Sequence, residues 1–115
     1  MGDGAPRMTG PTTAVLGVLL EQPDEVHYGL AVGALTALPS GTVHPILARL
    51  EGLGWVTSEW EDIDPSDLGR PRRRLYRLTD HGQACAAAAL SRADAQRARL
   101  GARALGPARP QGATS

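Results

Sequence analysis

The spacing of apolar residues changes at two glycines, Gly52 and Gly54. Before them, four apolar residues recur at the helical spacing i, i+3, i+4 and i+7: Val43, Ile46, Leu47 and Leu50. Ser40 precedes this stripe as an N-cap residue, and the glycines end the helix. After them, residues 55–60 are rich in β-branched and aromatic side chains, and residues 74–78 can form the partner strand. We therefore expect a helix at about 40–52 that is followed by a β-hairpin.

Three more helices are expected around this unit. Thr12 and Thr13 can cap a first helix that is apolar on most sides and should be buried, and a Gln-Pro-Asp sequence ends it. A short helix is expected at about 27–35, followed by a turn. Thr79 caps a last helix that runs to about residue 105, roughly 40 Å at 1.5 Å per residue. One small core cannot cover that length, so the last helix must bury its apolar face against something else.

The 115 residues suffice for one domain, and both ends of the chain are rich in glycine and proline. Residues 1–11 and 106–115 are therefore predicted to be disordered tails. The single cysteine, Cys85, cannot form an internal disulfide and fits a reducing compartment. No signal peptide and no apolar run near 20 residues is found, so we expect a soluble cytoplasmic protein that does not contact a membrane.

Charge is divided sharply along the chain, although 12 basic and 12 acidic residues cancel overall. Residues 1–69 hold two arginines against ten acidic residues, a net charge of −8, and residues 70–115 hold ten arginines against two, a net charge of +8. All the basic residues are arginine, which binds phosphate and guanine well but can also reflect a GC-rich genome. The asymmetry indicates a polyanionic partner. The ten acidic residues should then lie on the far side of the domain.

Four arginines stand at the tip and return of the hairpin: Arg70, Arg72, Arg73 and Arg74. One interpretation is a solvated loop whose charges offset the acidic residues just before it. The other is an arm that contacts phosphates or enters a minor groove, for which arginine is the preferred residue. The connection, at roughly 61–73, is long for a hairpin, and long loops tend to be functional or mobile.

The helix at 40–52 has an unusual outer face. Opposite its apolar stripe the helix carries small residues: Gly41, Pro45, Ala48 and Gly52. Thr42, His44 and Arg49 flank them with groups that form hydrogen bonds. Such a face suits a helix that must approach a flat polar surface closely. Pro45 removes an intrahelical hydrogen bond and should bend or loosen the start of the helix.

The order helix, helix, turn, helix, hairpin is that of a winged helix-turn-helix. We therefore predict a mainly α fold with a small β-hairpin, in which residues 12–79 form a DNA-binding domain. The helix at 40–52 is then the recognition helix, and the hairpin is the wing.

The chain from about residue 12 to 82 resembles the PadR family of bacterial transcriptional regulators. The resemblance rests on these stretches: 15–20 (VLGVLL), 27–29 (HYG), 39–51 (PSGTVHPILARLE), 54–56 (GWV), 69–79 (GRPRRRLYRLT) and Gly82. It implies a homodimeric repressor that binds double-stranded DNA at an inverted repeat. In such proteins the recognition helix reads the major groove, the wing contacts the backbone or the adjacent minor groove, and the C-terminal helix, here 80–105, forms the dimer.

Carried over by position, the implied DNA-binding residues are Ser40, Gly41, Thr42, His44, Pro45, Arg49, Arg70, Arg72, Arg73 and Arg74. The family usually has tyrosine where this chain has His44. An apolar stripe on the last helix gives the expected dimer contacts: Ala86, Leu90, Ala93, Leu100 and Ala104. Arg97 falls inside that stripe and either pairs with Asp94 or extends past the seam. Residues 80–105 contain no Phe, Tyr or Trp, so the aromatic drug site of multidrug-sensing relatives is not carried over.

Other functions have little support in the sequence. There is no P-loop, dinucleotide fingerprint or nucleophile elbow, so neither an enzyme nor a cofactor is expected. His81 and Cys85 stand at metal-binding spacing, but two ligands do not make a site. Two alternatives stay open: a winged-helix module that binds protein through its acidic surface without specific DNA binding, and a DNA binder with no effector pocket. A small-molecule effector is a further candidate partner, but the sequence does not identify it.

Overall fold

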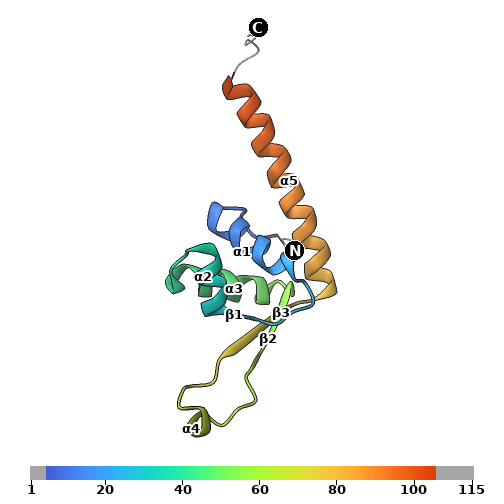
Figure 1. Cartoon of the computed structure of the whole chain (residues 1–115). Helices are drawn as coiled ribbons and strands as arrows, with labels where there is room; N and C mark the ends of the chain where they lie inside the picture. Colours follow the sequence, from blue (N-terminus) through green and yellow to red (C-terminus); the bar gives the residue numbers. More distant parts are fainter. Residues whose placement is uncertain (1–4, 106–115) are drawn as a thin grey trace.

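The computed structural model describes residues 5–105 of the chain, with side chains up to residue 102. Three helices, α1 (Gly10–Glu21), α2 (Gly29–Thr36) and α3 (Ser40–Gly52), pack beside a small antiparallel sheet. The sheet consists of β1 (His27–Tyr28), β2 (Val56–Trp60) and β3 (Arg74–Leu78), in the order β1-β3-β2. A short helix, α4 (Pro65–Leu68), lies in the β2–β3 connection, and the long α5 (Asp80–Leu105) leads away from the domain (Figure 1). The predicted winged helix-turn-helix is confirmed.

Strand β1 was not expected, because residues 27–35 were predicted to form one helix. That prediction is wrong for its first two residues. His27 pairs with Tyr76 and Tyr28 with Leu75, so the central strand β3 bonds to a strand on each side. The central strand β3 has backbone N–H and C=O groups at both edges that need hydrogen-bond partners. Residues 27 and 28 provide the partners at one edge, which requires them to be extended and not helical. Helix α2 therefore begins at Gly29.

Helix α1 begins earlier than predicted. Thr9, rather than Thr12 or Thr13, is the N-cap, and its Oγ1 accepts a hydrogen bond from the backbone N–H of Thr12 at 3.3 Å. Pro11 stands in the first turn, where its missing N–H costs nothing. The predicted disordered tail 1–11 is thus wrong for residues 10 and 11, which are helical, and for residues 5–9, where Pro6 is buried and Thr9 caps α1. Residues 1–4 of that tail, and the whole predicted tail 106–115, lie outside the described residues.

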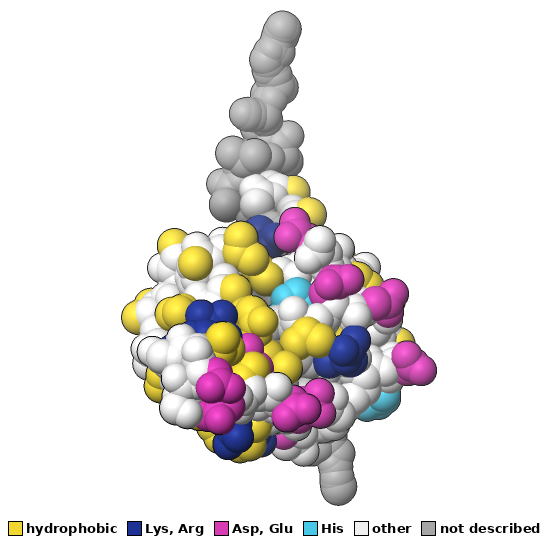
Figure 2. All heavy atoms as spheres, turned by 60° about the horizontal axis from the view of Figure 1, so that its bottom comes forward, with side chains coloured by type: hydrophobic (Ala, Val, Ile, Leu, Met, Phe, Trp, Pro, Cys, Tyr) yellow, Lys and Arg dark blue, Asp and Glu magenta, His cyan; other side chains and the backbone are white. Residues whose placement is uncertain are grey.

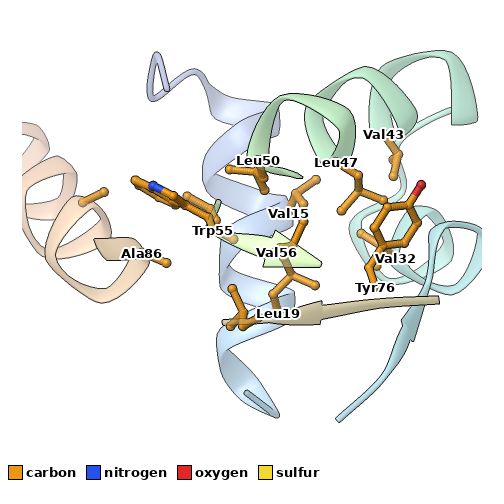
Figure 3. Packing of buried hydrophobic residues seen from close by; sticks show 13 residues of the cluster. Val15, Leu19, Val32, Val43, Leu47, Leu50, Trp55, Val56, Tyr76 and Ala86 are labelled. Carbon is orange, nitrogen blue, oxygen red and sulfur yellow. The ribbon is translucent and has the colours of Figure 1, made fainter. Parts of the chain in front are cut away.

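The core forms where the three helices meet the hairpin (Figure 3). Leu16 and Leu19 of α1 contribute fully buried side chains, as do Leu47 and Leu50 of α3. Trp55, at the turn between α3 and β2, is 2% exposed and lies toward α5, near Ala86 (Figure 3). The helical spacing predicted for α3 is confirmed, because Val43, Leu47 and Leu50 have no exposed surface.

Helix α5 has a packed half and an exposed half. Its first three turns pack on α1 and β3, and Ala86 and Ala89 are buried there. From Ser91 to residue 102 every side chain is exposed except Ala93, which is half-buried. The sequence predicted a helix too long for one core, and the 26 residues of α5 do extend beyond the domain (Figure 1).

Among the described residues, no single helix has the length and apolar character needed to cross a membrane; α2 and α3 meet that test only as a pair, with a bend of 119° between them.

Candidate nucleic-acid interface

The outer face of α3 is free of the core. Ser40, Gly41, His44, Pro45 and Arg49 are exposed, together with Ala48, and Thr42 is half-buried. Ser40 is the first residue of the helix rather than its cap: Pro39 occupies the N-cap position and provides no side-chain hydrogen bond. The helix continues through Pro45 to Gly52, although Pro45 has no N–H to donate to the carbonyl of Gly41. The structure therefore brings the predicted recognition residues together on one exposed surface.

His44 is held in place by two contacts. Its Nδ1 donates a hydrogen bond to the carbonyl of Ser40 at 3.0 Å, so Nδ1 carries a hydrogen, and Nε2 is an acceptor when the ring is neutral. The ring lies against the buried Gly29, where an added Cβ would stand 3.1 Å from Nε2. Sequence reasoning gave no role to Gly29, although it belongs to the His-Tyr-Gly stretch that carried the family resemblance. Its lack of a side chain makes room for His44.

The wing, defined here as residues 59–74, is closed at its base by Glu61. Arg70 donates to both carboxylate oxygens of Glu61, at 2.8 and 3.0 Å, and the backbone N–H of Arg73 donates to the same carboxylate at 3.1 Å. The Arg70 hydrogen bonds, followed by that from Arg73, lower the pKa of Glu61 from 4.5 to about 2, although burial opposes the shift. The same pair raises the pKa of Arg70. Arg70 is therefore a structural residue of the wing, with its charge already paired.

Arg74 is also bound within the chain. Its Nε donates to Ser58 Oγ at 3.0 Å, and Ser58 Oγ donates to Glu51 Oε2 at 2.6 Å. A guanidinium nitrogen of Arg74 lies 3.9 Å from the same Glu51 oxygen, and the guanidinium stacks 4.9 Å from the ring centroid of Trp60. This chain of contacts joins the wing to the last turn of α3. Sequence reasoning missed it because Glu51, Ser58 and Arg74 are far apart in sequence.

Arg72 and Arg73 are the exposed arginines of the wing. Arg72 donates from Nε to the carbonyl of Ile63 at 2.9 Å, and the Arg73 guanidinium stacks 4.9 Å from the ring centroid of Tyr28. Neither guanidinium pairs with a carboxylate within residues 5–105. Their positive charges are thus available to an anion.

The expectation that the acidic residues lie on the far side of the domain is wrong. Five carboxylates belong to the wing itself: Glu59, Glu61, Asp62, Asp64 and Asp67. Glu61 forms an ion pair with Arg70. Asp64 caps α4, because its carboxylate accepts hydrogen bonds from the Ser66 hydroxyl and N–H, and these bonds lower the pKa of Asp64. Figure 2 shows acidic and basic side chains mixed on the wing side of the molecule. The positive charge on this face is therefore confined to individual arginines, and the face is not uniformly basic.

The recognition helix and the wing meet at a hollow of about 390 Å³. His44 lies on one side of it, and Arg72, Arg73 and Arg74 lie on the other. Its aromatic lining comes from Tyr28, Trp60 and Tyr76, and burial raises the pKa of Tyr76. The structure thus brings His44, from the predicted DNA-binding residues of α3, to the same hollow as three of the four wing arginines.

The residues of the predicted dimer stripe are in different environments. Ala86 has no exposed surface, because it packs in the core of its own chain (Figure 3). Leu90 and Ala93 are half-buried, and Leu100 is 52% exposed. The side chain of Ala104 lies outside the described part. Arg97 pairs with Asp94 at 2.9 Å, the first of the two arrangements expected for it.

His81 and Cys85 do not extend into a metal site. Cys85 Sγ lies 3.6 Å from His81 Nε2, and no cluster of three or more metal-ligating side chains forms in residues 5–105.

Comparison with known proteins identifies the family. The transcriptional regulator PadR-like family matches residues 15–88, which include α2, α3, the sheet and the start of α5. No curated protein matches the chain.

Three solved structures have the same fold. The protein smu.1704 from Streptococcus mutans UA159 is 20% identical, with a TM-score of 0.67 over 88% of this chain and 92% of that one. The PcaV transcriptional regulator from Streptomyces coelicolor, solved with its natural ligand, is 25% identical, with a TM-score of 0.61 over 92% of this chain and 67% of that one. AbfR, solved in a disulfide form, is 32% identical over 67% of this chain, with a TM-score of 0.54, and this chain spans about half (51%) of its length.

Three observations point to the same family. Helix α3 has an exposed face beside the wing, the family model matches residues 15–88, and the similar solved structures include a transcriptional regulator. This chain belongs to the PadR-like family of transcriptional regulators, which are not enzymes.

Proposed function

We propose that the protein is a dimeric repressor that binds an inverted-repeat operator through α3 and the wing. The observation that carries this proposal is the exposed face of α3, which is small at its centre and edged by His44, Thr42 and Arg49. A helix without long side chains at its centre can approach the floor of the major groove closely, so Thr42 and His44 reach base edges. Membership of a family of transcriptional regulators supports the same conclusion.

Within the wing, the arginines have different proposed roles. Arg72 and Arg73 contact phosphates, because both are exposed and neither has a carboxylate partner in the described part of the chain. Arg70 and Arg74 position the wing, because their guanidiniums are already bound to Glu61 and to Ser58. This assignment narrows the sequence prediction, which treated all four arginines alike.

The dimer is proposed to form along the outer half of α5. The side chain of Leu100 is 52% exposed and that of Ala93 is half-buried, so both can contact a second protomer. Ala86 has no exposed surface, because it is buried in the core of its own protomer, and it cannot contribute to the dimer interface. Two α3 helices related by a two-fold axis would address half-sites about 34 Å apart, one turn of DNA. A ligand that releases the operator is part of the proposal by analogy with PcaV, which was solved with its natural ligand.

The salt dependence of DNA binding tests the role of the wing. The double variant Arg72→Ala/Arg73→Ala should lower the magnitude of the slope of log K against log salt by about 3.6, since the proposed dimer loses four phosphate contacts and each contributes about 0.9. The control is Arg77→Ala, which removes one exposed charge from β3, outside the proposed DNA contacts and outside the proposed dimer interface. A slope for the double variant equal to that of Arg77→Ala would remove Arg72 and Arg73 from the mechanism.

A second function is favoured by the acidic side chains of the wing. Glu59, Asp62 and Asp67 are exposed there, so a protein partner with a basic surface could bind this face. The same titration separates the two functions. A wild-type protein that fails to bind any DNA duplex at low salt would favour the protein-binding module.

A further inference from the structure

The N-terminal arm, defined here as residues 5–9, lies beside the recognition helix. Together they line a hollow of about 370 Å³. The arm and the start of α1 contribute Pro6, Arg7, Thr9 and Thr12, and α3 contributes Pro45, Ile46, Arg49 and Leu50. This hollow is separate from the one that joins α3 to the wing, with which it shares no residue.

The two hollows lie on opposite flanks of the exposed face of α3. At 100° per residue, His44 and Arg49 stand about 140° apart on the helix, with Ala48 and Pro45 between them. His44 lines the hollow on the wing side, and Arg49 lines the hollow on the arm side. The wing and the arm therefore bracket the surface that is proposed to face DNA.

The arm is held at a defined position. Pro6 is buried, and the backbone N–H of Thr9 donates to the carbonyl of Arg7 at 3.0 Å. Thr9 in turn caps α1, and the Thr13 hydroxyl donates to its carbonyl at 2.8 Å. The backbone of Arg7 is thus fixed between a buried proline and a capped helix, while its side chain is exposed.

The charges at this hollow differ from those of the surrounding sequence. Arg7 and Arg49 are the only basic residues in positions 1–69, which also contain ten acidic residues, and both line the hollow. No acidic residue contributes to its lining. Within residues 5–105 neither arginine forms an ion pair, and both are exposed. Two exposed arginines that form no ion pair within residues 5–105 thus line one hollow, and together they are suited to bind one anionic group.

We propose that Arg7 and Arg49 form a second phosphate-binding site, which holds the DNA backbone on the flank of α3 opposite the wing. The inference rests on the proposed DNA binding and adds Arg7, a residue outside the recognition helix and the wing, to the interface. The ligand is a backbone phosphodiester, so the contact carries no sequence information. DNA on this surface would be contacted by the wing at one edge of the groove that α3 enters and by Arg7 and Arg49 at the other edge.

The test measures binding to two 30-base-pair duplexes of unrelated sequence by fluorescence anisotropy across a salt series. Arg7→Ala should lower the magnitude of the slope of log K against log salt by about 1.8 on both duplexes, since the proposed dimer loses one contact from each protomer and each contributes about 0.9. Between 50 and 200 mM salt its affinity should then fall roughly 12-fold less than that of the wild type. Arg7→Lys should restore the wild-type slope, since lysine also binds phosphate as a point charge. Arg7 is exposed, so thermal melting of the variant should match that of the wild type.

The matched control is Arg77→Ala, which removes one exposed arginine from β3. A slope for Arg7→Ala equal to that of Arg77→Ala would overturn the arm site while leaving the proposed function intact. An effect of Arg7→Ala on only one duplex would overturn the phosphate assignment, because it would indicate a base contact. A wild-type protein that shows no salt-dependent binding to either duplex would overturn the proposed function, and the arm site with it.

Discussion

Gly82 fixes the point at which α5 leaves the DNA-binding domain, and its replacement by alanine should destabilise the fold. Gly82 is buried in the first turn of α5, against the backbone of Trp55. A Cβ at this position would lie 2.5 Å from the carbonyl carbon of Trp55 and 2.6 Å from its Cα, and would clash with its carbonyl oxygen. Real Cβ contacts do not fall below 3.0 Å, so the backbone would have to move by roughly 1 Å or more, chiefly to relieve the contact with the Trp55 carbonyl oxygen.

That movement would disturb three hydrogen bonds at the β3–α5 junction. The Thr79 N–H donates to the Trp55 carbonyl at 2.9 Å, the Thr79 hydroxyl to the Gly54 carbonyl at 2.8 Å, and the Gly82 N–H to Thr79 Oγ1 at 2.8 Å. Overpacking costs about 1–3 kcal/mol, and each weakened hydrogen bond adds up to about 1 kcal/mol. The helical preference of alanine returns about 1 kcal/mol. We expect a net loss of about 3 kcal/mol, equivalent to a fall in Tm of roughly 12–24 °C for a domain of this size.

Thermal unfolding followed by circular dichroism measures this effect. The control is Gly17→Ala in α1, where an added Cβ meets nothing within 4 Å. That variant should be neutral or more stable by up to about 1 kcal/mol, because alanine favours the helix. A Gly82→Ala variant that melts within a few degrees of the wild type would refute the packing argument for the α5 junction.

Three further predictions concern the interface and the dimer. Replacing His44 by alanine should change the sequence preferred in random-site selection while altering affinity for unrelated DNA less than about twofold, since His44 lies on the exposed face of α3 rather than among the phosphate contacts; an identical selected motif would count against base recognition by His44. Because Arg70 holds the pKa of Glu61 at about 2, below the ordinary 4.5, the ionised pair should stabilise the wing above about pH 4.5 and be lost as the pH falls toward 2. The Arg73 amide shift in NMR should titrate accordingly, and Glu61→Gln should abolish that titration; a midpoint near 4.5 in the wild type would contradict the pairing. Finally, Leu100→Glu should weaken self-association on the order of a hundredfold in analytical ultracentrifugation, because two exposed leucines lose their burial; an unchanged mass would place the dimer contact elsewhere.

The recognition helix and the hairpin were predictable because their signals are local. The i, i+3, i+4, i+7 spacing from Val43 to Leu50 specifies both the helix and its buried side, so the exposed side follows from it. The glycines at positions 52 and 54 fall where the helix ends and the chain turns into β2. The pairing of Arg97 with Asp94 was one of two arrangements that the sequence allowed, because the two residues are one helical turn apart.

Contacts between distant residues could not be predicted in this way. His27 is extended because it pairs with Tyr76, 49 positions later, and nothing near His27 in the sequence indicates that partner. The Arg70–Glu61 pair explains why acidic residues stand in the wing, yet the sequence alone allowed a solvated loop equally well. The apolar stripe on α5 places Ala86 and Leu100 on one face of the helix, but it does not specify which surface each of them packs against. Ala86 packs on its own core, whereas Leu100 is exposed.

The central claim is that α3 and the wing bind a specific inverted-repeat operator as a dimer. Selection of bound DNA from a random library by the full-length protein tests it most directly. We expect an enriched motif with two-fold symmetry, whose half-sites lie about 10 base pairs apart, or about 34 Å. Recovery of no motif, from a protein that also fails to retard any duplex at low salt, would contradict the account.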